Sequence, residues 1–550
     1  MRNREKRWYK VWPSITQKRF DVEKAASEYL REWATLTPKR VALSFYGKDI
    51  TYEELNRSID RFAHGLINLG LKKGSRVALQ MQNCPQFVIS FFGTLRAGGV
   101  VVSLNPMFKH VELAYEINDA TPEVLVSLDS LYPEVEKIGA RVSLKHTIIT
   151  SLGDYFPENP ILPPPSEAKV PKRSFPGTLD FMAFLGKAED RPLCVVDDLE
   201  NDLALLQYTG GTTGLPKGAM LSHFSVACCG LGTVYWYRLR EDDVTLGLLP
   251  FFHVFGMNVA MCAALMSGGQ LVLLSVFTPE VTAKAIAHYQ CSFWPAVPTM
   301  VIALLEMPGV EAYDFDSLRA VASGGAPISA ETQRRFKELI PKGFLGEGYG
   351  LTETNAQGGL FAPLHLSKPG FIGIPQISEV KIVDLETGQR ELSPNHEGEI
   401  VFKSPTTMKG YWNKPEETKK VLKKGWLRTG DIGMMDEDGY VKVSGRKKEL
   451  IICSGFNVFP AEVEDLLHRH PAIAEVAVIG IPDSYRGESP KAFIVLKADY
   501  KGKVTEEEIL HWCKENMSAY KRPRVVQFRD DLPKSGAGKV LRRVLKEEGA

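Results

Sequence analysis

The 550-residue chain is too long for one ordinary hydrophobic core, so several domains are expected. Apolar residues make up 44% and charged residues 24%, which is typical of globular proteins. The 67 Lys and Arg residues against 66 Asp and Glu leave a net charge of +1, so overall charge argues against a nucleic-acid partner. The eight cysteines include no Cys-x-x-Cys pair, which argues against a metal cluster and indicates a reducing, cytoplasmic setting.

The first ten residues are basic, and no long apolar segment follows them. This pattern argues against a signal peptide. We expect a solvated tail, with a peripheral contact to the inner face of a membrane as the alternative.

Residues 244–277 contain no charged side chain, which raises the question of a membrane span. Pro250, His253 and the Gly268-Gly269 pair interrupt the segment. We therefore predict a buried helix over residues 257–266 and a buried strand over residues 270–276.

The first 370 residues alternate short apolar strands with helical stretches, for example a strand at 76–79 before a helix at 85–96, and a strand at 318–322 before a helix at 329–339. This alternation predicts parallel sheets covered by helices. After Gly373, short strands at 379–384, 398–403 and 440–444 indicate a β-rich subdomain. After Gly445, strands at 450–453, 476–481 and 491–496 and helices at 460–467 and 505–516 indicate a separate small domain.

The most informative segment reads Tyr208-Thr-Gly-Gly-Thr-Thr-Gly-Leu-Pro-Lys-Gly218 and follows an apolar strand at 203–207. Its backbone N–H groups and hydroxyls can surround an anion such as the phosphates of a nucleotide. It is not a Walker A loop, because Gly218 rather than Ser or Thr follows Lys217. A flexible glycine turn is the alternative, but the threonines and the Pro-Lys-Gly exit favour phosphate binding.

Three further segments have the composition of a nucleotide site. Gly346-Glu-Gly-Tyr-Gly-Leu-Thr-Glu353 offers an aromatic face for adenine at Tyr349 and a carboxylate for Mg²⁺ at Glu353. Ser323-Gly-Gly-Ala-Pro327 follows a strand and opens a helix, where backbone can meet a flat base. In Trp426-Leu-Arg-Thr-Gly-Asp431, the Asp431 carboxylate can accept both ribose hydroxyls. Each segment taken alone is an ordinary loop.

Two cationic segments lie nearer the carboxyl end. Residues 445–460 place three cations before an apolar strand, and residues 533–543 carry Lys539 on a glycine loop. Either would ordinarily be a solvated charge run.

In their order and spacing, these motifs resemble the adenylate-forming superfamily of acyl-CoA synthetases, luciferases and peptide-synthetase adenylation domains. The resemblance runs from about residue 51 to residue 543. Within it the chain is most similar to bacterial-type long-chain fatty acyl-CoA synthetases, because Gly210 stands where most relatives have serine. Ile452 and Asn457 differ from the lysine and glutamine usual in coumarate ligases and luciferases.

The resemblance implies an α/β fold: a large ATP- and acyl-binding domain (1–447) made of two α/β subdomains plus a β-rich subdomain, and a small mobile α+β domain (448–550). It also implies two steps. A fatty carboxylate attacks the α-phosphate of ATP to give acyl-AMP and pyrophosphate, and the thiol of coenzyme A then displaces AMP. Because each unit-charge repulsion at about 4 Å is worth roughly 4 kcal/mol at an effective dielectric near 20, the site needs positive charge aimed at the phosphates.

The family's nucleotide contacts map onto matching positions here. The phosphates are assigned to the glycine-rich loop, adenine to the segments 323–327 and 346–353, and the ribose to Asp431 and Arg446. The residues are Thr209, Gly210, Gly211, Thr212, Thr213, Gly214 and Lys217 for phosphate; Gly325, Ala326, Glu347, Gly348 and Tyr349 for adenine; and Asp431 and Arg446 for the ribose.

The remaining roles concern catalysis and coenzyme A. Glu353 is implied to bind Mg²⁺ beside Thr352, His253 to sit beside the acyl carboxylate, and Lys539 to bridge that carboxylate and the α-phosphate. Lys448 matches the hinge of the mobile domain and Gly455 the pantetheine tunnel. Lys521, with its neighbour Arg522, is a candidate partner for the phosphates of coenzyme A, and a solvated pair is the alternative.

Three other functions stay open at this point: a ligase for medium-chain or aryl acids, an acyl-AMP ligase serving a separate carrier protein, and a nucleotide-binding protein without catalysis. A homodimer is an expectation from the relatives. Acyl chain length does not follow from the sequence.

Overall fold

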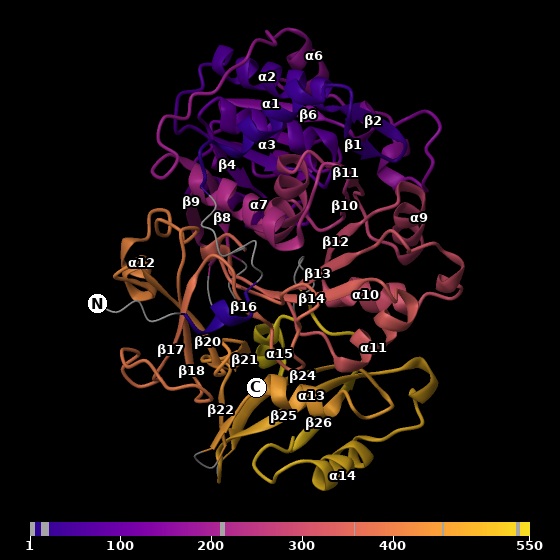
Figure 1. Ribbon diagram of the computed structural model, residues 1–550, viewed down its shortest axis with the longest axis vertical. Helices are drawn as coiled ribbons and strands as arrows, with labels where there is room; N and C mark the ends of the chain where they lie inside the picture. Colours follow the sequence, from indigo (N-terminus) through magenta and orange to yellow (C-terminus); the bar gives the residue numbers. More distant parts are fainter. Residues whose placement is uncertain are drawn as a thin grey trace. The chain divides into compact units, whose positions relative to one another are not determined.

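The computed structural model describes residues 6–12, 21–209, 215–356, 358–453, 456–483, 485–534 and 540–549. The chain folds into two compact units (Figure 1). Unit 1 comprises Met1–Thr209, Pro216–Glu379 and Lys403–Leu427, and unit 2 comprises Gly210–Leu215, Val380–Phe402 and Arg428–Ala550.

Unit 1 contains a seven-stranded sheet in the order β7-β6-β5-β3-β4-β8-β9, parallel except for the last strand. The strands are β3 (Arg76–Gln80), β4 (Val100–Ser103), β5 (Val124–Leu128), β6 (His146–Thr150), β7 (Leu179–Asp180), β8 (Leu203–Tyr208) and β9 (Gly218–Ser222). The helices of this part of the chain are α2 (Tyr52–Asn68), α3 (Pro85–Arg96), α4 (His110–Ala120), α5 (Tyr132–Glu136), α6 (Phe181–Gly186) and α7 (His223–Tyr237).

A nine-stranded sheet in the order β16-β15-β14-β13-β12-β10-β11-β1-β2 completes the framework of unit 1. Its strands are β1 (Val41–Phe45), β2 (Lys48–Thr51), β10 (Val244–Gly247), β11 (Gln270–Leu273), β12 (Phe293–Ala296), β13 (Ala320–Gly324), β14 (Phe344–Tyr349), β15 (Leu360–Phe361) and β16 (Ile374–Pro375). The helices are α1 (Ala26–Leu36), α8 (Ala263–Met266), α9 (Pro279–Tyr289), α10 (Pro298–Leu305) and α11 (Ala330–Leu339).

One hydrophobic core joins the two sheets of unit 1. It includes Val77 and Leu79 of β3, Leu246 of β10 and Phe92 of α3. Helix α3 is buried along its whole length, and Arg96 at its end is bound by the Asp60 carboxylate at 2.8 Å. Because removing one partner would leave an uncompensated buried charge, this pair fixes α3 against α2.

The local sequence explains where the helices begin. Thr51 caps α2 in a capping box with Glu54, and Ser329 caps α11 by accepting the backbone N–H of Thr332. The predicted helices at 85–96 and 329–339 and the predicted strand at 76–79 are therefore confirmed to within a residue or so, and the α/β class is confirmed.

The predicted helix over residues 257–266 differs in type. It begins at Phe255 and runs in wide π-helical turns to Cys262 before α8 continues it (η5, Phe255–Cys262). Gly256 packs so closely on the preceding backbone that a Cβ there would lie 2.4 Å from the Pro250 carbonyl, and Asn258 Nδ2 donates to the Val254 carbonyl at 3.1 Å. Both contacts favour the widened turn. The strand that follows ends at Leu273 rather than at residue 276.

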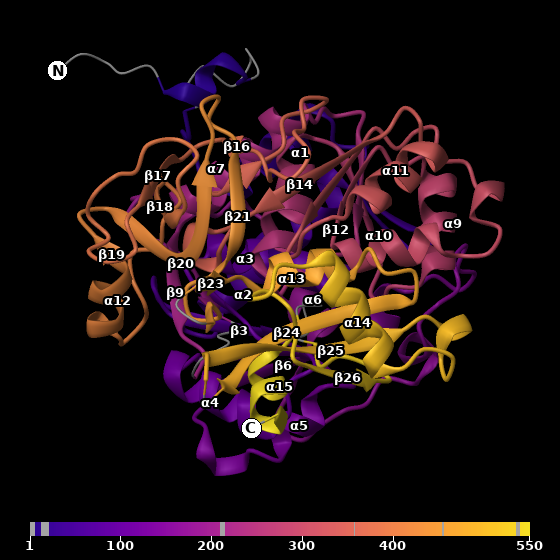
Figure 2. The ribbon, with the colours of Figure 1, turned by 90° about the horizontal axis from the view of Figure 1, so that it is seen from below.

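Unit 2 is built from short antiparallel strands and a compact carboxyl-terminal α+β region. In the first sheet, β17 (Glu379–Val383), β18 (Gly398–Lys403), β20 (Trp426–Met435) and β21 (Val441–Arg446) follow one another, and β19 (Leu422–Lys423) pairs with the two residues of β20 that belong to unit 1. The second sheet contains β22 (Ile451–Cys453), β23 (Phe456–Val458), β24 (Ile473–Asp483), β25 (Gly487–Leu496) and β26 (Val525–Arg529). The helices, labelled in Figure 2, are α13 (Pro460–Leu467), α14 (Glu506–Asn516) and α15 (Arg542–Gly549). Helix α12 (Pro415–Val421) belongs to unit 1.

Short 3₁₀ turns occupy Arg7–Lys10, Gly139–Arg141, Leu152–Tyr155, Ser166–Lys169, Val310–Ala312 and Ala498–Tyr500. Residues 380–402 and 428–447 belong to the same compact unit as the carboxyl-terminal region. The predicted domain boundary between residues 447 and 448 marks the expected hinge of the mobile domain rather than the edge of a compact unit. This boundary stays a prediction.

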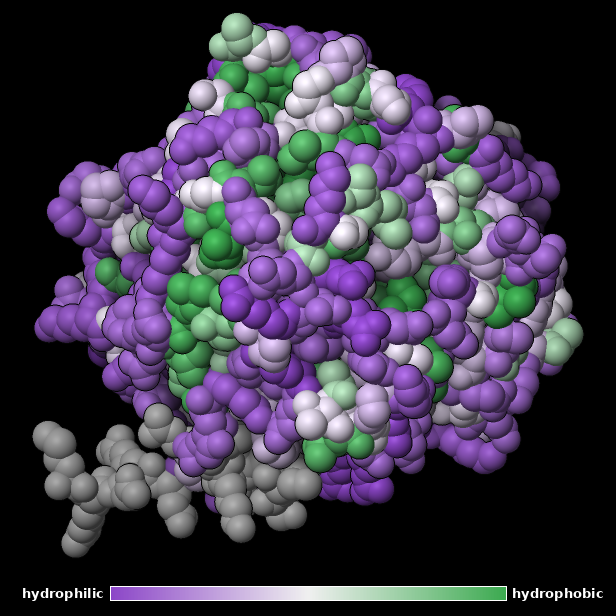
Figure 3. Space-filling view, turned by 90° about the horizontal axis from the view of Figure 1, so that it is seen from above, coloured by the Kyte–Doolittle hydropathy of each residue, from purple (hydrophilic) through white to green (hydrophobic). Residues whose placement is uncertain are grey.

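In the described part of the chain, no helix is both long and apolar enough to cross a membrane. Figure 3 shows one face of the molecule, on which hydrophobic residues form separate areas between hydrophilic ones.

Burial raises the pKa of Glu116 on α4 to about 8, and the charges of Glu112 and Asp119 add to the rise. The unfolded chain would ionise this carboxyl near its ordinary pKa of 4.5, so the folded state holds an extra proton between about pH 4.5 and pH 8. Stability from this group is therefore full at low pH and declines as pH rises through that window.

We expect Glu116→Gln to raise the melting temperature more at pH 8.5 than at pH 5, because the neutral amide avoids the cost of a buried charge. Thermal unfolding followed by circular dichroism measures this, with the exposed Glu136→Gln as control. An equal effect of Glu116→Gln at both pH values would contradict it.

Candidate functional site

Two of the predicted adenine loops leave the nine-stranded sheet side by side. Strands β13 and β14 are parallel, with Ser323 opposite Glu347 and Gly324 opposite Gly348, so residues 325–326 and 349–353 emerge at the same edge. The carboxyl edge of a parallel sheet is where ligands bind in α/β folds. Gly325 has φ +90°, a conformation that favours glycine.

Glu347 ties these two loops together. Its Oε1 accepts the backbone N–H of Ile328 at 3.0 Å, just before α11 begins. A Cβ at Gly348 would lie 2.8 Å from the ring of Phe361, so this position has no room for a side chain. The structure thus brings Gly325, Ala326, Glu347, Gly348 and Tyr349 to one edge of the sheet.

Thr352 and Glu353 lie on a short turn (η7, Thr352–Thr354), and buried side chains hold the residue that follows it. Asn355 has φ 54°, and its amide accepts from Asn258 Nδ2 at 2.8 Å and donates to Ser225 Oγ at 3.0 Å. Because Asn355 is fully buried, these bonds fix the turn on which the half-buried Glu353 stands.

Tyr411 completes the surroundings of Glu353. Its hydroxyl donates to Glu353 Oε1 at 2.7 Å. Burial and the Glu353 carboxylate raise the pKa of Tyr411 far above its usual value, so the hydroxyl stays protonated and keeps donating. Glu353 therefore presents a second carboxylate oxygen that this bond leaves unused.

Lys217 reaches the same cluster. Its ammonium lies 5.1 Å from the centroid of the Tyr411 ring and 2.5 Å from Glu417 Oε2. The Lys217 ammonium, with Lys420 as a second partner, lowers the pKa of Glu417 to about 2. A cation, an aromatic ring and two carboxylates thus meet at the exit of the glycine-rich loop.

Sequence reasoning missed Tyr411 and Glu417. They are 58 residues from Glu353 and 200 residues from Lys217, respectively; Tyr411 stands in a segment with the composition of a turn, and Glu417 lies in the first turn of α12. The Gly410-Tyr-Trp pattern beside Pro415 was a usable signal only for a turn, not for a contact at that distance.

The base of the glycine-rich loop is closed by a hydrogen bond from the Thr209 N–H to the Lys217 carbonyl at 3.0 Å. The predicted phosphate contacts Gly210, Gly211, Thr212, Thr213 and Gly214 lie outside the described residues, as do Gly455 and Lys539.

His253 lies just before the widened helix η5. Its Nδ1 accepts the N–H of Phe255 at 3.2 Å, so in this arrangement the ring proton is on Nε2. The carbonyl of Phe252 accepts from Gln207 Nε2 of β8 at 2.9 Å. His253 is therefore anchored to the strand that leads into the glycine-rich loop.

Unit 2 holds the predicted ribose contacts. Asp431 is buried and lies opposite Arg446 across β20 and β21, with 3.0 Å between Arg446 Nε and Asp431 Oδ1. Lys448 is exposed in the turn between β21 and β22. Lys521 is bound to Glu462 of α13. Burial lowers the pKa of the Lys521 ammonium, but the Glu462 carboxylate raises it by more, so the pKa lies above its usual value.

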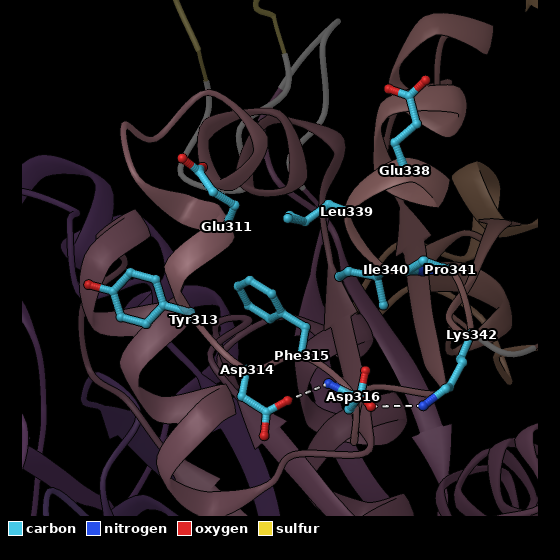
Figure 4. A pocket seen from close by; sticks show the side chains of 10 residues that line it. All are labelled: Glu311, Tyr313, Asp314, Phe315, Asp316, Glu338, Leu339, Ile340, Pro341 and Lys342. Atoms are coloured by element: carbon cyan, nitrogen blue, oxygen red, sulfur yellow. Dashed lines mark hydrogen bonds and ion pairs between the residues drawn. The ribbon is translucent and has the colours of Figure 1, made fainter.

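A surface pocket of about 260 Å³ lies elsewhere in unit 1 (Figure 4). Its lining includes the carboxylates of Glu311, Asp314, Asp316 and Glu338, and its Lys342 is already paired with Asp316 at 2.8 Å. This acidic pocket would repel phosphate and contains none of the predicted site residues. In the described residues, no group of three or more His, Cys, Asp or Glu could hold a metal ion on its own.

Two family models match this chain. Residues 30–412 match the AMP-binding enzyme family, and residues 462–539 match the AMP-binding enzyme C-terminal domain. The chain belongs to the AMP-binding enzyme family.

Named relatives of this AMP-binding enzyme extend over nearly its whole length. It is 40% identical to a long-chain-fatty-acid–CoA ligase of Bacillus subtilis, over 99% of this chain and 98% of that one. It is 36% identical to a long-chain-fatty-acid–CoA ligase of Escherichia coli O157:H7, over 91% of this chain and 90% of that one. The crystal structure of ATP-bound MatB from Rhodopseudomonas palustris superposes with a TM-score of 0.82 at 32% identity, covering 96% of this chain and 99% of that one.

The turn that carries Glu353 depends on close backbone packing at Gly350. A Cβ there would lie 2.0 Å from the Ala356 carbonyl oxygen. We expect Gly350→Ala to destabilise the AMP-binding enzyme by about 1–3 kcal/mol, because the backbone must shift, and to reduce ATP–pyrophosphate exchange at least tenfold. Thermal unfolding and the exchange assay measure the two effects. Gly186→Ala is the control, since a Cβ at Gly186 meets nothing within 4 Å. Wild-type exchange by Gly350→Ala would show that the turn tolerates displacement.

Proposed function

We propose that the protein is an AMP-forming long-chain fatty acid–CoA ligase. The observation that carries the proposal is the cluster of Lys217, Tyr411 and Glu353 at the base of the glycine-rich loop. A cation and a carboxylate of the kind that binds Mg²⁺, both beside this loop, support binding of the ATP phosphates there. The two relatives named long-chain-fatty-acid–CoA ligases support the acyl substrate.

The first half-reaction joins a carboxylate to the α-phosphate, and the residues act mainly by position and charge. Residues 209–217 bind the β- and γ-phosphates, with Lys217 exchanging part of its contact with Glu417 for phosphate. The 325–326 backbone and Tyr349 hold adenine, and Asp431 with Arg446 binds the ribose. Lys539 bridges the fatty carboxylate and the α-phosphate, which reduces the repulsion between them.

Mg²⁺ fits the donor set at Glu353. This ion is ordinarily bound by one or two carboxylates together with substrate phosphates rather than by an all-protein cage. Glu353 has one oxygen committed to Tyr411 and another available for the ion, and Thr352 is the neighbouring hydroxyl. When bound, Mg²⁺ would neutralise charge on the phosphates.

The acyl group is expected beside His253 and the widened helix η5. Residues 256–264 include Ala260, Ala263 and Ala264, whose small side chains would leave room for a long chain, whereas the space beside Gly256 is filled by the Pro250 carbonyl. Helix packing explains the same small residues, so the acyl pocket rests on the relatives more than on this composition.

In the second half-reaction coenzyme A must reach the position that Lys539 occupied. We propose that the segment after Lys448 moves as the mobile domain, that the Gly455 turn lines the pantetheine path, and that Lys521 meets the phosphates of coenzyme A. Peripheral membrane contact through the basic amino-terminal segment and a homodimer stay predictions.

The substrate class is tested by AMP release from ATP and Mg²⁺ with acetate, octanoate, palmitate, oleate, benzoate or 4-coumarate, with and without coenzyme A. We expect coenzyme-A-dependent turnover that is greatest with palmitate or oleate. A maximum with octanoate or an aryl acid would keep the reaction and replace the substrate. Acyl-AMP that accumulates regardless of coenzyme A would identify a ligase serving a carrier protein instead.

The role of Lys539 is tested by separating the half-reactions. We expect Lys539→Ala to slow ATP–pyrophosphate exchange on the order of a hundredfold, because the carboxylate and α-phosphate lose their shared cation. Thioester formation from supplied acyl-AMP should remain near wild type. The matched control is Lys546→Ala, an exposed lysine on α15. Equal losses in both half-reactions would argue against a mobile domain that carries Lys539.

A further inference from the structure

The glycine-rich loop is supported at both ends by a single helix. On α4, Asp119 Oδ2 accepts the hydroxyl of Tyr208 at 2.8 Å, and Tyr208 is the last residue of β8. One turn earlier on the same helix, the Tyr115 hydroxyl donates to the Pro216 carbonyl at 3.0 Å. Thr209 and Lys217 pair directly between these two contacts.

Asp119 also connects the loop to the segment that carries Tyr411. Its backbone carbonyl accepts from Trp412 Nε1 at 3.0 Å, and Lys414 Nζ lies 3.7 Å from its Oδ1. The Trp412 backbone N–H in turn donates to the Gly218 carbonyl at 2.7 Å. The strand before the loop, the strand after it and the Tyr411 segment therefore converge on the last turn of α4.

Helix α4 is itself fixed to the sheet. Arg76 of β3 donates to the carbonyl of Ala120 at 2.7 Å and to that of Thr121 at 2.9 Å, and its guanidinium lies over the Trp412 ring. Because the carboxyl end of α4 is tied down in this way, a contact with Asp119 or Tyr115 fixes its partner relative to the whole sheet. The Asp119 side chain is 14% exposed, so its bond to Tyr208 is only weakly screened by water.

The Tyr208 hydroxyl stays protonated and so keeps its hydrogen bond to Asp119. Burial, together with its hydrogen bond to Asp119, raises its pKa far above the usual value, so the hydroxyl remains a donor at any working pH. A Cβ at Gly218 would lie 3.2 Å from the Tyr208 ring, so the ring also determines how closely β9 approaches.

We propose that Tyr115 and Asp119 are positioning residues for nucleotide binding, which hold the two ends of the glycine-rich loop at the spacing that the phosphates require. This inference rests on the proposed function, because it assigns ATP to that loop. Neither residue touches substrate. Each acts through a neighbour, Asp119 through Tyr208 and Tyr115 through Pro216.

The test uses the full-length protein and measures ATP affinity by calorimetry with Mg²⁺ and no acid, followed by steady-state kinetics. We expect Tyr115→Phe and Asp119→Leu each to weaken ATP binding about three- to tenfold, the range for loss of one hydrogen bond. The KM for the fatty acid and thioester formation from supplied acyl-AMP should stay within about twofold of wild type, because these steps do not depend on the loop spacing. Asp119→Asn keeps an acceptor for Tyr208 and should restore most of the affinity.

Tyr52→Phe is the matched control. Its hydroxyl is also buried in unit 1 and donates to the Gly269 carbonyl at 2.8 Å, just before β11 and away from the loop and α4. It should lower thermal stability without changing ATP affinity. Because Asp119 acts through Tyr208, the double variant Tyr208→Phe with Asp119→Leu should lose no more affinity than Asp119→Leu alone.

Unchanged ATP affinity in Tyr115→Phe and Asp119→Leu would overturn the inference, as would an equal loss in Tyr52→Phe. A wild-type protein that binds ATP but activates none of the acids would contradict the proposed function alone, since the affinity comparison would still be decisive for α4.

Discussion

Repulsion between anions is the constraint on which the rest of this structure depends. For an acyl adenylate to form, a carboxylate and the triphosphate of ATP must meet in one small volume. The cation that would reduce this repulsion, Lys217, is already held in the folded chain near the Tyr411 ring and paired with Glu417. Positive charge is thus present in the folded chain before any ligand binds, and the cost of assembling it is part of the cost of folding.

The supporting framework follows from that need. The two sheets that contain β8, β13 and β14 share one hydrophobic core within unit 1. The segments that follow or face these strands are each tied to a neighbouring element by a buried polar contact. Gln207 links β8 to the His253 segment, Asn258 links η5 to the Glu353 turn, and Asp119 links α4 to β8. Since buried polar contacts are costly to leave unmade, these three bonds favour a single arrangement of the loops.

Sequence reasoning recovered the elements more fully than their contacts. The helices at 85–96 and 460–467 and the strand at 398–403 have the bounds that periodicity and capping residues predict, because those signals are local. The widened turns of η5 were missed because hydrophobic periodicity in a fully buried segment does not distinguish α from π geometry. Tyr411, Glu417 and Asp119 were missed because their partners are distant in the chain, and a single sequence carries no sign of such pairing. The motif residues Glu347 and Gly348 were found, but the role of Glu347 in holding Ile328 was not visible.

The widened turns between Phe255 and Cys262 have a consequence for how this region can vary. A π-helical turn accommodates one residue more than an α-helical turn, so the segment is equivalent to an ordinary helix with a one-residue insertion. Because an α-helix rotates about 100° per residue, loss of that residue would rotate the segment before it relative to the segment after it by roughly that angle. The core beyond Ala263 is packed on all sides and would resist rotation, so His253 would move instead. The extra residue therefore sets the rotation of the His253 segment relative to α8, and a shortened helix would keep the fold while redirecting the His253 side chain.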